Sequence, residues 1–185
     1  AGSAHDGVVT RKQLSARAVY RAAELLEATP GLIVSQHSGE GKANQYYLRG
    51  FNLDHGTDLR TTLDGMLVNQ RSHSHGQGWT DLNFLIPELA SGLQYRKGPY
   101  YADLGDFGSA GAVSIGYLNT LSQGIASVSA GENGYQRALL ADSPRHRGGN
   151  LLSARGLFHT DAPVLHPATL QTVNTVLGAR PRARA

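Results

Sequence analysis

The 185-residue sequence contains no cysteine. This absence excludes a disulfide scaffold, a thiolate metal site and a cysteine nucleophile, and it suits export through an oxidising compartment. No window approaches the ~18 consecutive apolar residues of a membrane helix, so the remaining route into a bilayer is a closed β-barrel of alternating strands. The chain begins with Ala1 and shows no charged-then-apolar leader. A signal peptide has therefore either been removed or never belonged to this chain.

The sequence also has little net charge, only +3. Much of the excess lies in Arg180–Arg184, which favours a solvated end over a nucleic-acid-binding arm. We expect residues 166–185 to form an irregular basic tail. Glycine, by contrast, is abundant, with 23 residues against a usual share of ~7%. Such enrichment predicts many turns and bulges, and hence a β-rich, loop-rich architecture.

The first part of the chain is predicted to change from a polar segment to a helix. Residues 1–14 are polar and show no periodicity. From Ser15, a plausible N-cap, apolar residues recur with helical spacing at Val19, Ala22, Ala23 and Leu26. Pro30-Gly31 should end this helix, and the strand Leu32–Ser35 should follow directly.

The middle of the chain predicts short strands joined by glycine turns. Strands are expected at Gln45–Arg49, Leu59–Leu63 and Leu93–Arg96, with a helical turn at Glu88–Ser91 opened by a proline. Asp64-Gly65 between apolar runs is a strong hairpin signal. Residues 69–81 are predicted to form a long polar loop that carries histidines.

After residue 113 the pattern changes to alternation with a period of two. Residues 125–130, 135–142 and 151–160 each place apolar side chains on one face and polar ones on the other. Segments of ~10 residues with this pattern are typical of barrel strands. The same pattern fits any half-buried antiparallel sheet, so on its own it leaves both interpretations open.

Six short elements together resemble the plug of TonB-dependent receptors. They occur in the family's order within residues 24–115, and their residues are Pro30-Gly31, Arg49-Gly50, Asp64-Gly65, Ile86-Pro87, Arg96-Lys97-Gly98-Pro99 and Ser109–Val113. Each element alone is weak, whereas the ordered set is specific.

The resemblance implies an α+β fold: a small mixed-sheet plug domain with short helices, followed by a few antiparallel strands of an incomplete transmembrane β-barrel. It divides the chain into a polar segment (1–14), the plug (15–117), the first barrel strands (118–165) and the tail (166–185). A family barrel of ~22 strands needs well over ~200 residues beyond the plug. We therefore expect this chain to be a fragment that is not transport-competent alone.

The same resemblance implies function and partners. Family members lie in the bacterial outer membrane and take up scarce ligands such as metal chelates, siderophores or haem, with energy delivered through TonB. Asp6–Thr10 is a faint candidate for the segment that TonB contacts, unless that segment lies upstream. Arg49 and Arg96 are suited to ion pairs with acidic groups on the barrel wall, and the lesser alternative is that both are merely solvated side chains.

Histidines are dense in the middle of the chain, and they form the candidate site. His73 and His75 are two residues apart, so in an extended chain both rings would project to one side and hold a metal. We hypothesise that a metal, metal chelate or haem-type ligand contacts a set of loop residues: His37, His55, His73, His75, Gln77 and Trp79. The alternative is that these are ordinary loop histidines bonded to backbone, with Trp79 as a loop anchor.

Enzyme motifs are absent or incomplete. Gly41-Lys42 lacks the remaining residues of a phosphate loop, and neither a His-Glu-x-x-His helix nor a Gly-x-Ser-x-Gly elbow occurs. A hydrolase that uses His73 or His75 as general base is the weakest alternative. No cofactor beyond a candidate metal or chelate is expected. The second function class that remains is a soluble periplasmic or secreted β-rich module that binds a ligand or metal.

Overall fold

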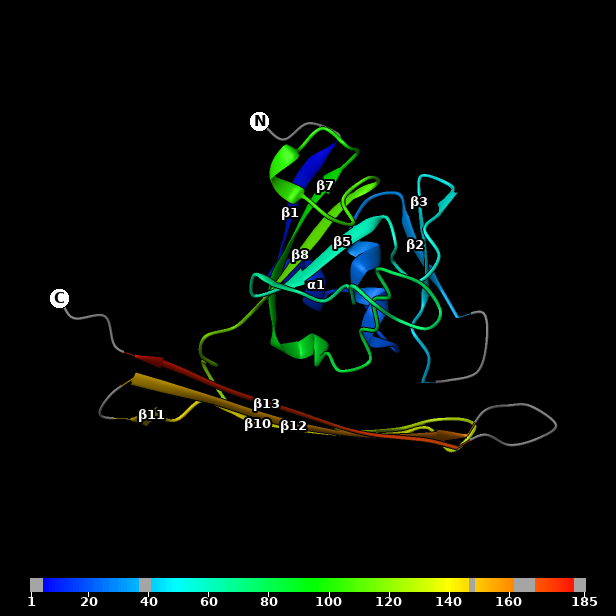
Figure 1. Ribbon diagram of the computed structural model, residues 1–185. Helices are drawn as coiled ribbons and strands as arrows, with labels where there is room; N and C mark the ends of the chain where they lie inside the picture. Colours follow the sequence, from blue (N-terminus) through cyan, green and yellow to red (C-terminus); the bar gives the residue numbers. More distant parts are fainter. Residues whose placement is uncertain (1–4, 37–40, 147–148, 162–168, 182–185) are drawn as a thin grey trace. The chain divides into compact units, whose positions relative to one another are not determined.

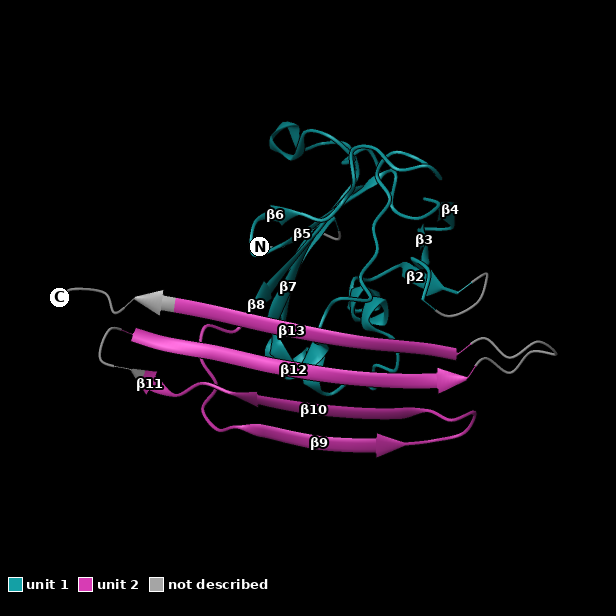
Figure 2. Ribbon diagram, turned by 60° about the horizontal axis from the view of Figure 1, so that its bottom comes forward, with its two compact units in different colours: residues 1–117 teal, residues 118–185 magenta. Residues whose placement is uncertain are grey.

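The computed structural model describes residues 5–36, 41–146, 149–161 and 169–181. The chain divides into two compact units, unit 1 with residues 1–117 and unit 2 with residues 118–185 (Figure 2). Each unit has its own sheets, and each is described separately.

A five-stranded mixed sheet forms the framework of unit 1 (Figure 1). Its strands lie in the order β1 (Asp6–Thr10), β7 (Ala90–Lys97), β8 (Gly111–Tyr117), β5 (Leu59–Leu63) and β6 (Met66–Leu67). Strand β8 runs antiparallel to β7 and parallel to β5. A mixed sheet with few helices is the fold class that the sequence predicted.

Two hairpins in unit 1 have two-residue turns that depend on glycine. Strands β2 (Leu32–Ser35), β3 (Gln45–Leu48) and β4 (Phe51–Asn52) form a second, antiparallel sheet. The turn between β3 and β4 is Arg49-Gly50, and the turn between β5 and β6 is Asp64-Gly65. All four turn residues have positive φ, as a type I′ turn requires. The hairpin predicted at Asp64-Gly65 is confirmed.

The helices are shorter than the sequence predicted. Helix α1 (Arg11–Ser15) ends at Ser15, where the prediction placed an N-cap; Thr10 and Gln13 instead form a capping box at its start. The apolar run further on forms the 3₁₀ helix η1 (Ala22–Ala28). The carboxylate of Glu24 accepts the backbone N–H groups of residues 20 and 21, which starts η1 there. The prediction of a long helix from Ser15 is therefore wrong, although Ala23 and Leu26 are buried and Val19 and Ala22 are partly buried.

The polar segment 1–14 is also more ordered than the sequence suggested. Residues 6–10 form β1, because the β-branched pair Val8-Val9 and Thr10 align with β7 from Gln94 to Gly92. The prediction missed this strand because one edge strand of five residues carries too short a pattern. Two further 3₁₀ turns, η2 (Pro87–Leu89) and η3 (Ala102–Leu104), precede and follow β7. Proline opens η2 as predicted.

One hydrophobic core holds unit 1 together, and it includes residues from both sheets and from α1 and η1. Its most completely buried large side chains are Leu25, Leu26, Tyr46, Leu59, Leu82, Leu93, Val113 and Ile115. None of the helices in the part of the chain that the structure describes is long and apolar enough to cross a membrane.

Unit 2 is an antiparallel sheet. Strands β9 (Ile125–Ala130), β10 (Gln136–Asp142), β12 (Gly149–Asp161) and β13 (Thr169–Pro181) pair in sequence, and β11 (Arg145–His146) also pairs with β12. The three predicted strand regions are confirmed. The irregular tail predicted for 166–185 is wrong, because β13 pairs with β12 from Thr169 to Pro181. The arginine-rich end of the sequence is typical of a solvated tail, but an alternating run precedes it, and this run forms the strand.

Candidate functional site

The candidate site begins in the loop that follows β4. The amide of Asp54 donates to the side chain of Asn52 at 2.8 Å, and Asp54 has a positive φ of 49°. Acidic and amide residues tolerate this conformation better than bulky ones. The turn places the Asp54 carboxylate at the surface, while the next side chain, His55, is buried with 3% exposure.

The His55 ring is oriented by the backbone of a distant segment. Its Nδ1 lies 3.0 Å from the carbonyl oxygen of Asn44, a buried residue just before β3. Because a carbonyl can only accept, Nδ1 carries the proton and Nε2 of the neutral ring presents its lone pair. The carbonyl of His55 accepts the amide of Thr80 at 2.7 Å. His55 is thereby tied to the loop that contains the other histidines.

Asn69 joins the two loops of the site. Its buried amide nitrogen donates to the carbonyl oxygens of Gly56 and Leu59 at 2.9 Å and of Gly78 at 3.2 Å. Its oxygen accepts the amide of Thr61 at 2.7 Å. One side chain therefore satisfies backbone groups of both loops, so the loops keep a fixed spacing without regular secondary structure.

Three histidines gather around the single tryptophan, and we call these four residues the histidine–tryptophan cluster. The ring of His73 stacks on Trp79 at 4.3 Å between centroids and 14° between planes. The rings of His55 and His75 lie 4.3 and 4.9 Å from Trp79, and 4.7 Å from each other. Trp79 is half-buried, and its ring contacts all three histidine rings.

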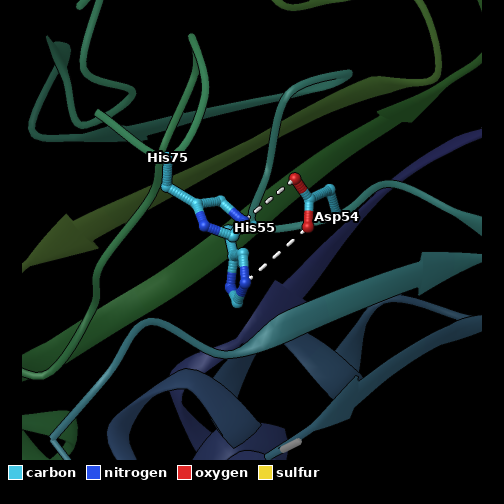
Figure 3. Close-up of side chains that lie close together, drawn as sticks. All are labelled: Asp54, His55 and His75. Atoms are coloured by element: carbon cyan, nitrogen blue, oxygen red, sulfur yellow. Dashed lines mark ion pairs between the residues drawn. The ribbon is translucent and has the colours of Figure 1, made fainter. Parts of the chain in front are cut away.

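Within this region, Asp54, His55 and His75 bring three metal-ligating atoms together (Figure 3). The Nε2 atom of His75 lies 3.6 Å from one carboxylate oxygen of Asp54, and that of His55 lies 3.7 Å from the other. All three ligand atoms lie within 4.8 Å of one another. The side chains of Asp54 and His75 are both 48% exposed, so the group opens to solvent on their side.

The sequence predictions for the site agree with the structure only in part. His55, His73, His75 and Trp79 do come together, whereas Gln77 is exposed in the same loop. His37 lies outside the described residues. The predicted ligand pair His73–His75 is not brought together: the loop bends there instead of extending, and Nδ1 of His73 accepts the amide of His75 at 3.1 Å.

Some residues of the site were not found from the sequence. These residues are Asp54, Asn44 and Asn69. Asn44 and Asn69 bond to residues 8 to 13 positions away, and Asp54 lies close to the more distant His75, so local patterns give no signal for these contacts. The one available hint was the density of histidines around Asp54.

The two arginines expected to bind a barrel wall have partners within unit 1. Arg96 forms an ion pair with Asp103 at 2.6 Å and lies over the Tyr101 ring at 5.2 Å. The hydrogen bond from Arg96 lowers the pKa of the Asp103 carboxyl. Arg49 lies with its guanidinium 3.0 Å from Nδ1 of His5. Both arginines are exposed, so a second partner can reach them.

A buried lysine beside these arginines was also missed. The Lys97 ammonium donates to the carbonyl of Pro30 at 3.1 Å and lies 5.2 Å from the Tyr95 ring centroid. Burial, and then the charge of Arg49, lowers the pKa of Lys97. Lys97 therefore ties β7 to the turn before β2, which is a structural role.

A family model described as TonB-dependent Receptor Plug Domain matches residues 4–112 of the chain. This range includes the whole histidine–tryptophan cluster and most of unit 1.

Solved structures extend the likeness into unit 2. The copper transporter OprC is 20% identical with a TM-score of 0.68, over 96% of this chain and 28% of that one. The ferric enterobactin receptor PfeA in complex with BCV-L6 is 17% identical with a TM-score of 0.65, over 87% and 25%. The Serratia marcescens hemophore receptor HasR is 25% identical with a TM-score of 0.55, over 85% and 24%. The chain thus spans about a quarter of the length of these proteins.

Proposed function

Because the chain belongs to the family of TonB-dependent receptor plug domains, we propose that it serves an outer-membrane receptor that takes up a scarce ligand. The observation that carries this proposal is the order of the two units. A mixed-sheet plug is followed directly by antiparallel strands, and the likeness to solved receptors continues across both. In this function the plug acts by binding and gating, and not by catalysis.

The side chains of unit 2 support a membrane location. Val128, Ala138, Leu157 and Val173 are direct cross-strand partners on β9, β10, β12 and β13, so they share one face of the sheet. Three of them are exposed apolar residues, and Val128 reaches 86% exposure. Apolar side chains directed outward from antiparallel strands are what a lipid-facing barrel surface requires.

The ligand we propose is a metal or a metal-containing compound, such as a chelate, a siderophore or haem. The relatives in the comparison are named for copper, ferric enterobactin and a hemophore with heme. The histidine–tryptophan cluster offers imidazole nitrogens and a flat aromatic wall, which suit such ligands. The proposed contact residues are His55, His75 and Trp79, with Gln77 nearby, and His73 stacks on Trp79 and supports their loop.

We propose that TonB supplies the energy for uptake by acting on the N-terminal segment of the plug. Strand β1 is at the edge of its sheet and pairs only with β7 among the described strands, over Asp6–Thr10. An edge strand is held by one row of hydrogen bonds, so it detaches more easily than an inner strand. If TonB contacts residues 6–10 themselves, β1 must first leave β7.

Cell fractionation with an uptake assay tests this function. The native gene product should fractionate with the outer membrane, and uptake of its ligand should require TonB. Radiolabelled copper, zinc, nickel and iron, each free and as a siderophore chelate, are the probes. A product found in the soluble periplasmic or culture fraction would instead support the soluble binding module.

A further inference from the structure

We propose that Asp54, His55 and His75 bind one divalent transition-metal ion. The ligands are one carboxylate oxygen of Asp54 and the Nε2 atoms of the two histidines (Figure 3). This inference deepens the proposed function and rests on it for its biological meaning, because it names the ligand class of the same loop site.

The spacing of the ligand atoms matches a metal site. Metal–nitrogen and metal–oxygen bonds of ~2.1 Å in tetrahedral geometry place ligand atoms about 3.4 Å apart. The Nε2 atoms of His75 and His55 lie 3.6 and 3.7 Å from the two different oxygens of the Asp54 carboxylate, and the three ligand atoms, one from each residue, lie within 4.8 Å of one another. These distances exceed a good hydrogen bond of ~2.7 to 3.2 Å. The three groups are therefore close enough to share an ion once the exposed side chains of Asp54 and His75 rotate to bring one carboxylate oxygen toward both Nε2 atoms.

The hydrogen bond that orients the His55 ring also suits a metal. Its Nδ1 donates to the Asn44 carbonyl at 3.0 Å, so Nε2 presents a lone pair toward Asp54. A histidine ligand whose other ring nitrogen donates to a backbone carbonyl or carboxylate is the usual arrangement in metal proteins, because that bond fixes the ring and raises its basicity. Asn44 is buried, so this orienting contact lies on the protected side of the ring.

The two loops that supply the ligands are fixed before any ion arrives. Asn69 binds the carbonyl oxygens of Gly56 and Gly78, one on each loop, and the Thr80 amide binds the carbonyl of His55. Binding therefore requires ordering of little more than the two exposed side chains, Asp54 and His75. Pre-organisation of this kind raises affinity, because less conformational entropy is lost on binding.

The ligand set favours particular metals and leaves a coordination position open. Two imidazoles and one carboxylate suit Cu²⁺, Ni²⁺ and Zn²⁺, and Cu²⁺ binds such ligands most strongly. Three protein ligands leave at least one position for water or a chelating molecule, on the side where Asp54 and His75 are exposed. An ion in a site of this kind can exchange with solvent. This property suits a transported metal better than a structural metal.

His73 is excluded from the ligand set by its own hydrogen bond. Its Nδ1 accepts the amide of His75, so the neutral ring carries its proton on Nε2 and has no lone pair left for a metal. Its ring is stacked on Trp79 at 14°. His73 therefore supports the loop, and this contrast with His75 makes the two histidines a matched pair for experiment.

Tryptophan fluorescence of the detergent-solubilised full chain measures binding directly. The chain has one tryptophan, and its ring lies within 5 Å of the rings of His55 and His75. Bound Cu²⁺ should quench Trp79 with a stoichiometry of one, and Zn²⁺, which does not quench, should compete. His75→Ala and Asp54→Asn should each weaken Cu²⁺ binding at least ~10-fold, since even outer contacts of a metal site matter by 10- to 100-fold.

Two control variants make the assignment specific. His159→Ala removes a histidine that lies 3.6 Å from Asp161 in unit 2, the same spacing without a third ligand among the described residues, and should change affinity by less than ~2-fold. His73→Ala should also keep the affinity within a few-fold of wild type when measured by calorimetry. Unchanged binding in His75→Ala, or a loss in His73→Ala as large as in His75→Ala, overturns the proposed ligand set.

The two proposals fail separately. If the solubilised chain binds Cu²⁺ with the predicted variant pattern but cells show no TonB-dependent uptake, the metal site stands and the receptor function falls. If the protein is in the outer membrane and supports uptake, but the chain neither binds Cu²⁺ nor Zn²⁺, the receptor function stands and the metal site falls.

Discussion

Unit 1 and unit 2 bury their apolar side chains in opposite ways. In unit 1, strands, helices and loops all contribute to one core, where Leu26 and Tyr46 have no exposed surface. Unit 2 is a sheet with large, solvent-exposed apolar side chains on one face, including Leu177 at 74% exposure and Val128 at 86%. Burial of apolar surface is the main source of stability. Unit 1 therefore has a hydrophobic core that stabilises its own fold. The apolar face of unit 2 is stabilised only when an apolar environment such as lipid covers it.

The largest effect should come from a core substitution in unit 1. Leu26→Ala removes a completely buried side chain and should lower the free energy of unfolding by ~2 to 5 kcal/mol. Urea denaturation followed by Trp79 fluorescence reports unit 1 alone. The matched change in unit 2, Leu177→Ala, should alter amide exchange of β13 by less than ~0.5 kcal/mol. Equal losses in both units would contradict the contrast between them.

A polar substitution in the loops should have the next largest effect. Asn69→Ala leaves the Thr61 amide without the acceptor that Asn69 supplies and removes one donor each from the carbonyl oxygens of Gly56, Leu59 and Gly78, which keep a second donor, so it should cost about 2 kcal/mol. The same variant should weaken Cu²⁺ binding, because the loops of the site lose their common tie. Gln171→Ala, at an exposed amide on β13, is the control and should leave both quantities unchanged. A normal Cu²⁺ affinity in Asn69→Ala would mean that the loops are held by other contacts.

Alkaline pH should destabilise unit 1 through a buried tyrosine. Burial, and then the charge of Asp81, raises the pKa of Tyr46, whose hydroxyl donates to the Thr80 carbonyl. The unfolded chain ionises near pH 10 while the folded one does not. The stabilisation is therefore complete below pH 10 and is lost above it, by at most ~1.4 kcal/mol per pH unit for this group. Tyr46→Phe should be less stable at pH 8 but should show a shallower alkaline decline in urea midpoints.

The smallest effect on stability should come from the exposed ion pair of Arg96 and Asp103. Arg96→Ala should leave the urea midpoint of unit 1 nearly unchanged at neutral pH, since both side chains are solvated. Because the pKa of Asp103 is lowered, whatever the pair contributes is present above the ordinary carboxyl range and is lost as the pH falls through the lowered value. If Arg96 also binds a barrel wall, uptake by the native receptor should fall well beyond the stability change.

Local sequence was sufficient where a short pattern decides the structure. Asp64-Gly65 predicts its hairpin because both residues tolerate positive φ, and the alternating runs of unit 2 predict strands because the two faces differ. The helix after Ser15 failed because helical spacing does not distinguish an α-helix from a 3₁₀ segment that long-range packing shortens. The strand 169–181 was missed because β12 supplies its partner.

The candidate site shows the same limit. The density of histidines predicted its location, and His55, His73, His75 and Trp79 do cluster there. Which of them offers a lone pair depends on hydrogen bonds from residues elsewhere in the chain, the Asn44 carbonyl for His55 and the His75 amide for His73. Spacing alone placed His73 in the ligand pair, whereas the ligand set that we propose contains His55 and Asp54 instead.

Amide hydrogen exchange of the full chain, with and without detergent micelles, tests the contrast between the units most directly. Unit 1 should keep its slowest exchange in β5, β7 and β8 in both conditions, because their residues are buried in its own core. Strands β9, β10, β12 and β13 should be protected only when micelles cover their apolar face. Equal protection of unit 2 in plain buffer, or loss of protection in unit 1 without micelles, would contradict this account.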